Sequence, residues 1–446
     1  MLRKRFIIFP CISLLVACTG LQPAMKPENV VLTEFPPAES RLIDGGDIFL
    51  FLSFSGGGTR AAALSYGVLE ELRDTRFTSA DITARLLDEV DIISSVSGGS
   101  FTAAYYGLYG DQIFEEFDEV FLKRNVQKNL IWRLLNPVNW IRSITTGISR
   151  TEAAVEYYDK HVFNEATFAD LYNHDGPFIE INATDLGTGD RFAFTPDTFR
   201  LICTDLSQIK VSEAVTASSA YPVAFAPLVL KNHADNCSME KPEWIKKPQA
   251  DAHFFTRKQT IIDNMESYLD ADSRPYIHLI DGGIADNLGL HAVIDRVIIH
   301  DGARGVVDMI QDPLPETLAF IVVNAETEPD NSFEQDSKKP TMGEISSALL
   351  GTHVRQMNLE TRSLMQENIG RWTAELSENK RGAYYIEVSF EGIDAPEEKT
   401  YFNSIGTTLS LPDDEVDRLR EAGRQLLRES PQFQELLAHL NRNPAR

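Results

Sequence analysis

Three glycine-rich turns constrain the fold of this chain, because each of them follows an apolar, strand-like run. Their sequences are Ser55-Gly56-Gly57-Gly58-Thr59-Arg60, Ser95-Val96-Ser97-Gly98-Gly99 and Asp281-Gly282-Gly283. The first two turns precede segments with apolar residues at helical spacing, over 61–72 and 101–108. A strand, a tight turn and a helix, repeated in this way, indicate an α/β fold with a mainly parallel central sheet and helices on both faces.

Further periodic segments extend this pattern along the chain. Strands are predicted over 47–54, 90–93, 178–183, 276–280, 318–323 and 384–390, the last at a sheet edge. Long helices are predicted over 344–366 and, as a closing pair, between 413 and 440. No linker rich in Pro or Ser divides these segments. We therefore expect one domain over 47–446, with the three turns inside 47–325 and a C-terminal helical and strand extension over 326–446.

The formal net charge of −24 in a chain of 446 residues limits its partners. Nucleic acid would repel such an acidic protein, so we expect no nucleic-acid partner. Anionic lipid surfaces would be unfavourable for the same reason. The sequence does not predict an oligomeric state.

The N-terminus has the features of an export signal. Basic residues at 3–5 precede an apolar run over 6–16 that is too short to span a bilayer. The run ends in Leu15-Val16-Ala17-Cys18, which resembles the lipobox of bacterial lipoproteins. This resemblance implies a signal peptide over 1–17, lipidation of Cys18, a Pro-rich tether over 18–46 and anchoring in the cell envelope, with Thr19 resembling the outer-membrane sorting pattern. The alternative is a plain signal peptide in which Cys18 is incidental.

Only Cys203 and Cys237 would remain as thiols in the mature protein. In an oxidising compartment they would form a disulfide, and the alternative is two unpaired buried cysteines. The spacings typical of metal sites, such as CxxC and HExxH, do not occur. We therefore predict no metal site.

Ser97 stands where a nucleophile is expected. A serine in a sharp strand-to-helix turn projects its hydroxyl clear of the backbone, provided that small neighbours let strand and helix approach. Gly99 is the downstream small residue, and Ser95 takes the upstream position that glycine usually occupies. A turn with a purely structural purpose is the alternative for this segment alone.

The glycine run Gly56, Gly57 and Gly58 indicates an anion site made of backbone amides. Amides beside a helix N-terminus stabilise the negative charge that develops on an ester carbonyl during hydrolysis, so these three are the predicted oxyanion hole. The spacings of phosphate-binding loops are absent. Arg60 would either bind a substrate phosphate or brace the loop.

Asp281 is the candidate base. An Asp-Gly-Gly segment alone is usually a turn, but a carboxylate opposite an exposed serine acts as a general base when burial raises its pKa. A triad would need a histidine, and His278, His291 and His300 lie nearby in sequence. Nothing in their positions marks one of them as a partner, which favours a Ser97–Asp281 dyad.

Together these motifs, in this order, resemble the patatin-like phospholipases. Two further segments match that family: Ile181-Asn182-Ala183-Thr184-Asp185-Leu186 and Ala217-Ser218-Ser219-Ala220-Tyr221-Pro222. The similarity runs from about 47 to 325, and it departs from the family at Ser55, where many members have Asp, and at Ser95. It implies a three-layer α/β/α fold, a Ser97–Asp281 dyad, an oxyanion hole at Gly56–Gly58 and lipid acyl hydrolysis without metal or cofactor.

The function predicted on this basis is cleavage of fatty-acyl esters in a membrane phospholipid or lysophospholipid. A segment over 121–148 mixes Trp132, Trp140 and other apolar residues with Lys and Arg, which is typical either of a surface that lies on a membrane or of an ordinary amphipathic helix. Two other functions stay open: a non-catalytic lipid-binding envelope lipoprotein with a degenerate hydrolase fold, and a transacylase.

Overall fold

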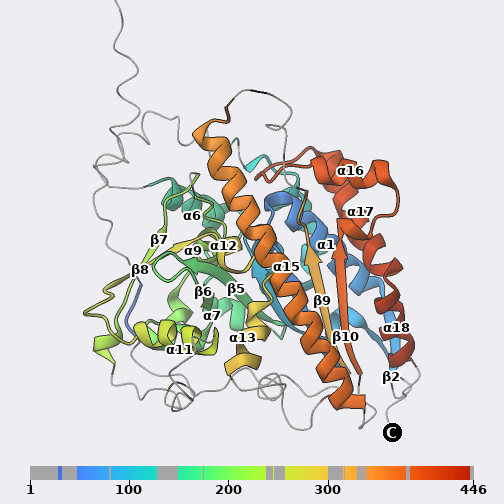
Figure 1. Ribbon diagram of the computed structural model, residues 1–446, viewed down its shortest axis with the longest axis horizontal. Helices are drawn as coiled ribbons and strands as arrows, with labels where there is room; N and C mark the ends of the chain where they lie inside the picture. Colours follow the sequence, from blue (N-terminus) through green and yellow to red (C-terminus); the bar gives the residue numbers. More distant parts are fainter. Residues whose placement is uncertain are drawn as a thin grey trace, which may run out of the picture.

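An eight-stranded mixed sheet forms the centre of the molecule (Figure 1). The computed structural model describes residues 29–32, 48–79, 82–126, 128, 149–173, 175–222, 224–237, 245, 257–299, 315, 317–328, 337, 339–377 and 382–441. The strand order is β10-β9-β1-β4-β5-β8-β7, and β6 pairs with β5. The strands are β1 (Ile48–Phe54), β4 (Val90–Val96), β5 (Phe178–Asp185), β6 (Arg191–Phe194), β7 (Leu228–Lys231), β8 (Tyr276–Ile280), β9 (Thr317–Asn324) and β10 (Gly382–Ser389). A separate hairpin joins β2 (Arg76–Ser79) and β3 (Ile82–Arg85).

The five strands from β10 to β5 run parallel, and β6, β8 and β7 are antiparallel to their neighbours. Helices cover the sheet. They are α1 (Gly58–Asp74), α2 (Gly98–Tyr109), α3 (Ile113–Phe117), α6 (Arg150–His161), α7 (Phe168–Tyr172), α8 (Pro196–Leu201), α9 (Val211–Ser218), α11 (Arg257–Ser267), α12 (Gly283–Asp286), α13 (His291–Ile299), α15 (Met342–Ser377), α16 (Pro396–Ser404), α17 (Asp413–Glu429) and α18 (Pro431–Leu440).

Successive side chains of the central strands point to opposite faces of the sheet, so the core has two layers. Leu50 and Leu52 of β1 pack with the side chains of α1 and α2 in one apolar cluster. Phe49 and Phe51 point to the opposite face and pack in a second cluster, which includes apolar residues of α13 and α15. In Figure 1, α15 crosses the near face of the sheet. The three-layer α/β/α fold with a mainly parallel central sheet is therefore confirmed, although the predicted strand over 276–280 is antiparallel to its neighbours.

The C-terminal extension packs on the same sheet. β10 is the edge strand beside β9, as predicted, and α17 lies along α1. The apolar residues of α17 and α18 belong to the same cluster as those of α1. The Thr59 amide at the start of α1 donates to the Thr408 carbonyl at 2.8 Å. The segment after 326 therefore completes the structure around the first glycine-rich turn.

Part of the predicted tether is docked on the protein body. Within 18–46 the structure describes only residues 29–32, and Val31 forms an isolated antiparallel bridge with Thr204. Asn29 donates to the Thr204 hydroxyl at 3.0 Å and to the Lys231 carbonyl at 2.8 Å. These contacts dock four residues of the predicted tether on the protein body, and the rest of 18–46 lies outside the described residues.

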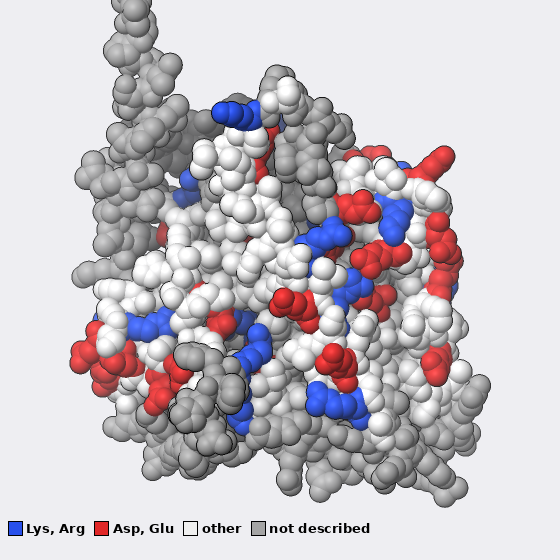
Figure 2. Space-filling view, viewed as in Figure 1, with Lys and Arg blue, Asp and Glu red and all other residues white. Residues whose placement is uncertain are grey.

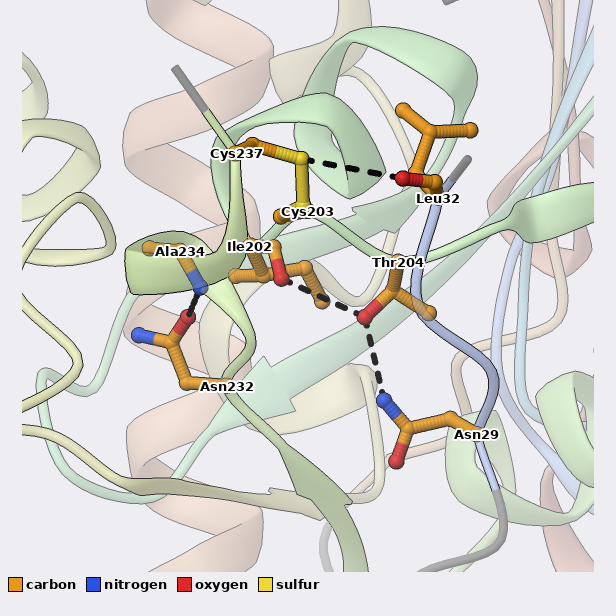
Figure 3. The surroundings of a disulfide bond; sticks show 8 residues. All are labelled: Asn29, Leu32, Ile202, Cys203, Thr204, Asn232, Ala234 and Cys237. Atoms are coloured by element: carbon orange, nitrogen blue, oxygen red, sulfur yellow. Dashed lines mark hydrogen bonds between the residues drawn. A yellow bond between two sulfur atoms is a disulfide. The ribbon is translucent and has the colours of Figure 1, made fainter. Parts of the chain in front are cut away.

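Cys203 and Cys237 form a disulfide beside this docked segment (Figure 3). The Cys237 sulfur lies 3.8 Å from the carbonyl oxygen of Leu32. The crosslink joins the loop after α8 to the segment after β7. Of the two alternatives for these cysteines, the structure has the bonded one.

Several predictions fall outside the described residues. These are the signal peptide over 1–17, the lipidation of Cys18 and most of the basic, aromatic segment over 121–148. Phe121 and Leu122, at the start of that segment, are buried in the core. Among the described helices, none combines the length and the apolar character needed to cross a bilayer.

Candidate active site

Ser97 occupies the sharp turn between β4 and α2. Its backbone has a φ of 49° and a ψ of −118°, a conformation that costs a non-glycine residue free energy. Ser97 directly follows the carboxyl end of β4, and the next residues begin α2. The side chain is nearly buried, with 8% of its surface exposed. The strain at Ser97 is the local feature that a nucleophile elbow requires.

The hydroxyl of Ser97 donates a hydrogen bond of 3.0 Å to Oδ2 of Asp281. The other carboxylate oxygen of Asp281, Oδ1, accepts from the Gly283 amide at 2.9 Å. Backbone bonds hold Asp281 on both sides: its amide donates to the Ala220 carbonyl, and its carbonyl accepts from the Thr184 hydroxyl at 2.8 Å. The two predicted catalytic residues, 184 positions apart, are therefore in direct contact.

Burial changes the acidity of this carboxyl group. Desolvation raises the pKa of Asp281 from 3.8 to about 6, against the opposing effect of the bonds from Gly283 and Ser97. A carboxylate with a pKa near neutrality accepts a proton more readily than an ordinary aspartate does. The environment of Asp281 thus suits a general base.

The glycine loop lies directly against the elbow. A Cβ atom added to Gly98 would overlap the backbone of Gly58, so only glycine allows this approach. Gly57 and Gly58 have φ values of 140° and 62°, which L residues rarely adopt. A Cβ on Gly56 would lie 3.4 Å from that of Ser97. The loop is therefore adjacent to the hydroxyl of Ser97.

The amides of this loop differ in availability. The Gly56 amide donates to the Asn287 carbonyl at 3.0 Å, so it is already used, contrary to its predicted place in the oxyanion hole. Within the described part of the chain, the amides of Gly57 and Gly58 have no acceptor, and neither has the amide of Gly98. Gly98 follows Ser97 and begins α2, a position from which an amide commonly binds an oxyanion. Sequence reasoning did not include it.

Arg60 braces the structure. Its guanidinium donates to the Ala325 carbonyl at 2.9 Å, to the Ile405 carbonyl and to the Thr407 hydroxyl at 3.2 Å. Burial lowers the pKa of this arginine to about 10. With its donors directed at the protein and 4% of its surface exposed, Arg60 is not placed to bind substrate, and the alternative of a loop brace holds.

The two serines that depart from the family pattern are both buried and bonded to backbone groups. The Ser55 hydroxyl accepts from the Ala325 amide at 2.9 Å and donates to the Gly56 carbonyl at 3.2 Å. The Ser95 hydroxyl donates to the Glu180 carbonyl at 3.2 Å. Neither contact involves Ser97 or Asp281, so the departures leave the contact between these two residues intact.

Ser218, at the end of α9, connects the parts of the site and was not among the predicted site residues. Its hydroxyl accepts from the Ser97 amide at 2.8 Å and donates to the Asn182 carbonyl at 2.6 Å. Its own carbonyl accepts from the Gly282 amide at 2.9 Å. Ser218 thus connects the turn at Ser97, β5 and the turn at Asp281.

Hydrogen bonds fix the side chain of Asn182 in turn. Its side-chain amide donates to the Ser94 hydroxyl at 2.9 Å and to the Ser95 carbonyl at 3.0 Å. Its side-chain oxygen accepts from Arg191 at 2.8 Å, and Arg191 pairs with the fully buried Glu180. Buried hydrogen bonds of this kind help to fix the position of Asn182 beneath the turn that carries Ser97.

We expect Ser218→Ala to lower kcat about 10-fold to 100-fold with little change in KM, because the Ser97 amide and the Asn182 carbonyl would lose their partner. Ser219→Ala is the matched control, since the Ser219 hydroxyl bonds only within its own helix, at 2.7 Å to the Val215 carbonyl. Steady-state kinetics on a soluble ester distinguish the two. Equal effects of both variants would contradict a positioning role for Ser218.

The described histidines do not complete a triad. His278 projects from β8 to an exposed position. The His291 ring lies 3.0 Å from the Arg257 guanidinium and 3.3 Å from the Thr361 hydroxyl. His300 lies outside the described residues. Among the described residues, the side chain that bonds to the Asp281 carboxylate is Ser97 and not a histidine, which favours direct proton transfer from Ser97. In the described ranges, no group of three or more His, Cys, Asp or Glu side chains is arranged to hold a metal ion.

The chain has recognisable relatives. A sequence profile described as Patatin-like phospholipase matches residues 52–294. Human GIVD cytosolic phospholipase A2 is similar in structure, with 9% identity and a TM-score of 0.38 over 88% of this chain and 62% of that one. VipD from Legionella pneumophila has 12% identity and a TM-score of 0.28 over 87% and 66%. This chain spans less than two thirds of either protein, and no curated protein matches it.

Proposed function

Because this chain belongs to the patatin-like phospholipase family, we propose that it hydrolyses fatty-acyl esters of membrane phospholipids or lysophospholipids. The observation that carries this proposal is the 3.0 Å hydrogen bond from the Ser97 hydroxyl to Asp281 beside a loop with free backbone amides. A serine, a carboxylate of raised pKa and amide donors are the groups that acyl transfer needs. Their contact supports a hydrolase over a non-catalytic lipid-binding protein.

The first half of the reaction forms an acyl-enzyme. The Ser97 oxygen attacks the ester carbonyl carbon while Asp281 takes the hydroxyl proton. The amides of Gly57, Gly58 and Gly98 would stabilise the negative oxygen of the tetrahedral intermediate. The bond from carbon to the alcohol oxygen then breaks, and the leaving alcohol takes the proton from Asp281. The acyl group stays on Ser97.

The second half releases the fatty acid. Water attacks the acyl carbon, and Asp281 accepts one proton of this water. Collapse of the second tetrahedral intermediate breaks the bond to the Ser97 oxygen, which recovers the proton. The free enzyme is restored without a metal or cofactor in any step.

We expect the kcat/KM of the wild-type protein to rise with pH through about 6 and then to level off. Asp281 must be ionised to accept the proton, and burial raises its pKa to about 6. Initial rates on an uncharged soluble ester between pH 4.5 and 8.5 measure this profile. A rate that is flat across that range, or that falls as pH rises through 6, would contradict the role of Asp281 as base.

Product analysis tests the proposed function. Wild-type protein incubated with a mixed phospholipid extract should release free fatty acid and the matching lysolipid, both detected by mass spectrometry, and Ser97→Ala should release neither. Transfer of the acyl group to an added alcohol, without free fatty acid, would identify a transacylase. Absence of any acyl product from wild-type protein would refute the proposal.

We further propose that the protein is exported and anchored in the bacterial cell envelope, at the outer membrane, through lipidated Cys18. The lipobox-like sequence at 15–18 and the disulfide between Cys203 and Cys237 support this, because disulfides persist in oxidising compartments. Metabolic labelling with a radioactive fatty acid should mark the wild-type protein and not Cys18→Ser. Equal labelling of both proteins would contradict this anchor.

A further inference from the structure

The N-terminal half of α15 carries an unusual share of exposed apolar surface. Of the eight large apolar side chains that are exposed among the described residues, four belong to this helix: Met342, Ile345, Leu349 and Leu359. Met342 and Leu349 expose 76% and 66% of their surface, and Ile345 exposes 37%. Exposed apolar groups that cluster in this way mark an interaction site rather than a random surface.

This half of α15 projects from the body. From Met342 to residue 357 no residue of the helix is buried, and Asn358 is the first that is. Figure 1 shows the N-terminal end of α15 extending past the carboxyl ends of β9 and β10. The second half, by contrast, buries Met365 and Trp372 against the sheet. We call residues 342–357 the projecting half-helix.

The apolar residues of the projecting half-helix share one face. Met342, Ile345 and Leu349 are three and four residues apart, a spacing that places them along one side of a helix. Glu344 and Arg355 are the only charged residues in 342–357, and their charges cancel. Figure 2 shows a largely uncharged surface here, whereas the surface around α16 and α17 carries many acidic and basic groups.

The projecting half-helix lies beside the active site. α15 packs against α12, which begins two residues after Asp281. The His353 ring donates from Nε2 to the Ile284 carbonyl at 3.2 Å. The segment that carries the base and the projecting half-helix are therefore joined directly. A surface that binds this apolar face would therefore lie close to the candidate active site.

We propose that the projecting half-helix docks the protein on a neutral phospholipid surface, with Met342, Ile345 and Leu349 entering the interface. The role of this docking in catalysis rests on the proposed function, whereas the docking itself does not. A protein of net charge −24 gains nothing from anionic lipids, and an uncharged apolar face suits zwitterionic headgroups. Binding should therefore depend little on salt.

Vesicle binding tests this docking surface. The full chain with Cys18→Ser and Ser97→Ala, which carries no acyl anchor and does not turn over, is floated with phosphatidylcholine vesicles at low and high salt. Adding Ile345→Ser and Leu349→Ser should lower the vesicle-bound fraction at least 10-fold. Tyr276→Ser is the matched control, because Tyr276 is 49% exposed but begins β8, at the opposite end of that strand from Asp281. Unchanged binding of the double variant would overturn the docking surface.

Activity and self-association complete the test. With Ser97 intact, the double variant should lose vesicle hydrolysis at least 10-fold and keep full hydrolysis of a soluble short-chain ester. If the wild-type protein hydrolysed neither vesicles nor the soluble ester, the proposed function would be refuted. The flotation experiment would still show whether the projecting half-helix binds vesicles. Sedimentation equilibrium tests whether the apolar face binds a second copy of the chain instead. A dimer of the wild-type protein, together with a monomeric double variant, would show that it does.

Discussion

Replacing Ser97 with alanine should lower kcat/KM for lipid and soluble esters by about 10⁴-fold or more, because no other group would form the acyl-enzyme. The fold should be unaffected. Alanine at a φ of 49° bears the same backbone strain as serine, and the lost hydroxyl makes one hydrogen bond, to Asp281. Steady-state kinetics and the thermal unfolding midpoint measure the two effects.

Ser95→Ala is the control for this variant. Ser95 lies two residues upstream in the same elbow and is fully buried, but its hydroxyl contacts the Glu180 carbonyl rather than Asp281. We expect its activity to stay within a few-fold of wild type. Turnover that survives in Ser97→Ala, or that falls as far in Ser95→Ala, would show that Ser97 is not the nucleophile.

Asp281→Asn should lower kcat about 10²-fold to 10⁴-fold, since the amide cannot accept the proton of Ser97. The substitution keeps the shape of the side chain, and its oxygen can still accept from the Gly283 amide, which lies 2.9 Å from Oδ1 in the wild-type protein. The loss should appear in kcat at all pH values, and the rise through pH 6 should disappear. Activity that survives Asp281→Asn and vanishes with His291→Ala would favour a triad.

The same variant should be more stable than the wild-type protein at pH 8. Because burial raises the pKa of Asp281, the folded protein holds this proton more tightly than the unfolded chain does. Stability therefore falls as pH rises from 3.8 to about 6, and the cost of the buried carboxylate, about 3 kcal/mol, is fully present above pH 6. Asparagine avoids this cost. Urea unfolding at pH 8 should show Asp281→Asn to be stabilised by about 1–3 kcal/mol, with no gain near pH 4.

The strands and turns that build the site were predictable from local pattern. β1 and β4 have apolar runs that end at glycine-rich turns, and Asp281 directly follows β8. β1 and β4 are parallel, so the turns that follow them lie at the same edge of the sheet. β8 is antiparallel to β5, and Asp281 comes close to Ser97 through the pairing of Ile280 with Thr184, which no local pattern shows. The contact of Ser97 with Asp281 was predicted from the resemblance to the patatin-like family.

The residues that the sequence analysis assigned differently or missed depend on distant partners. Arg60 bonds to the carbonyls of Ala325 and Ile405, and the Gly56 amide bonds to Asn287. No local pattern shows that such donors are already used. Ser218 differs from Ser219 only in its tertiary contacts, with the Ser97 amide 121 positions away. Residues 29–32 dock through a single bridge to Thr204. So short a pairing produces no periodic pattern in the sequence from which the docking could be predicted.

Labelling with a fluorophosphonate, followed by mass spectrometry of the peptides, tests most directly whether Ser97 is a nucleophile activated by Asp281. We expect one phosphonyl adduct, on the peptide that contains Ser97, formed faster as pH rises through about 6 and slowed strongly in Asp281→Asn. An adduct on another serine would contradict this role of Ser97, as would no adduct in folded wild-type protein or equal labelling of the Asp281 variant.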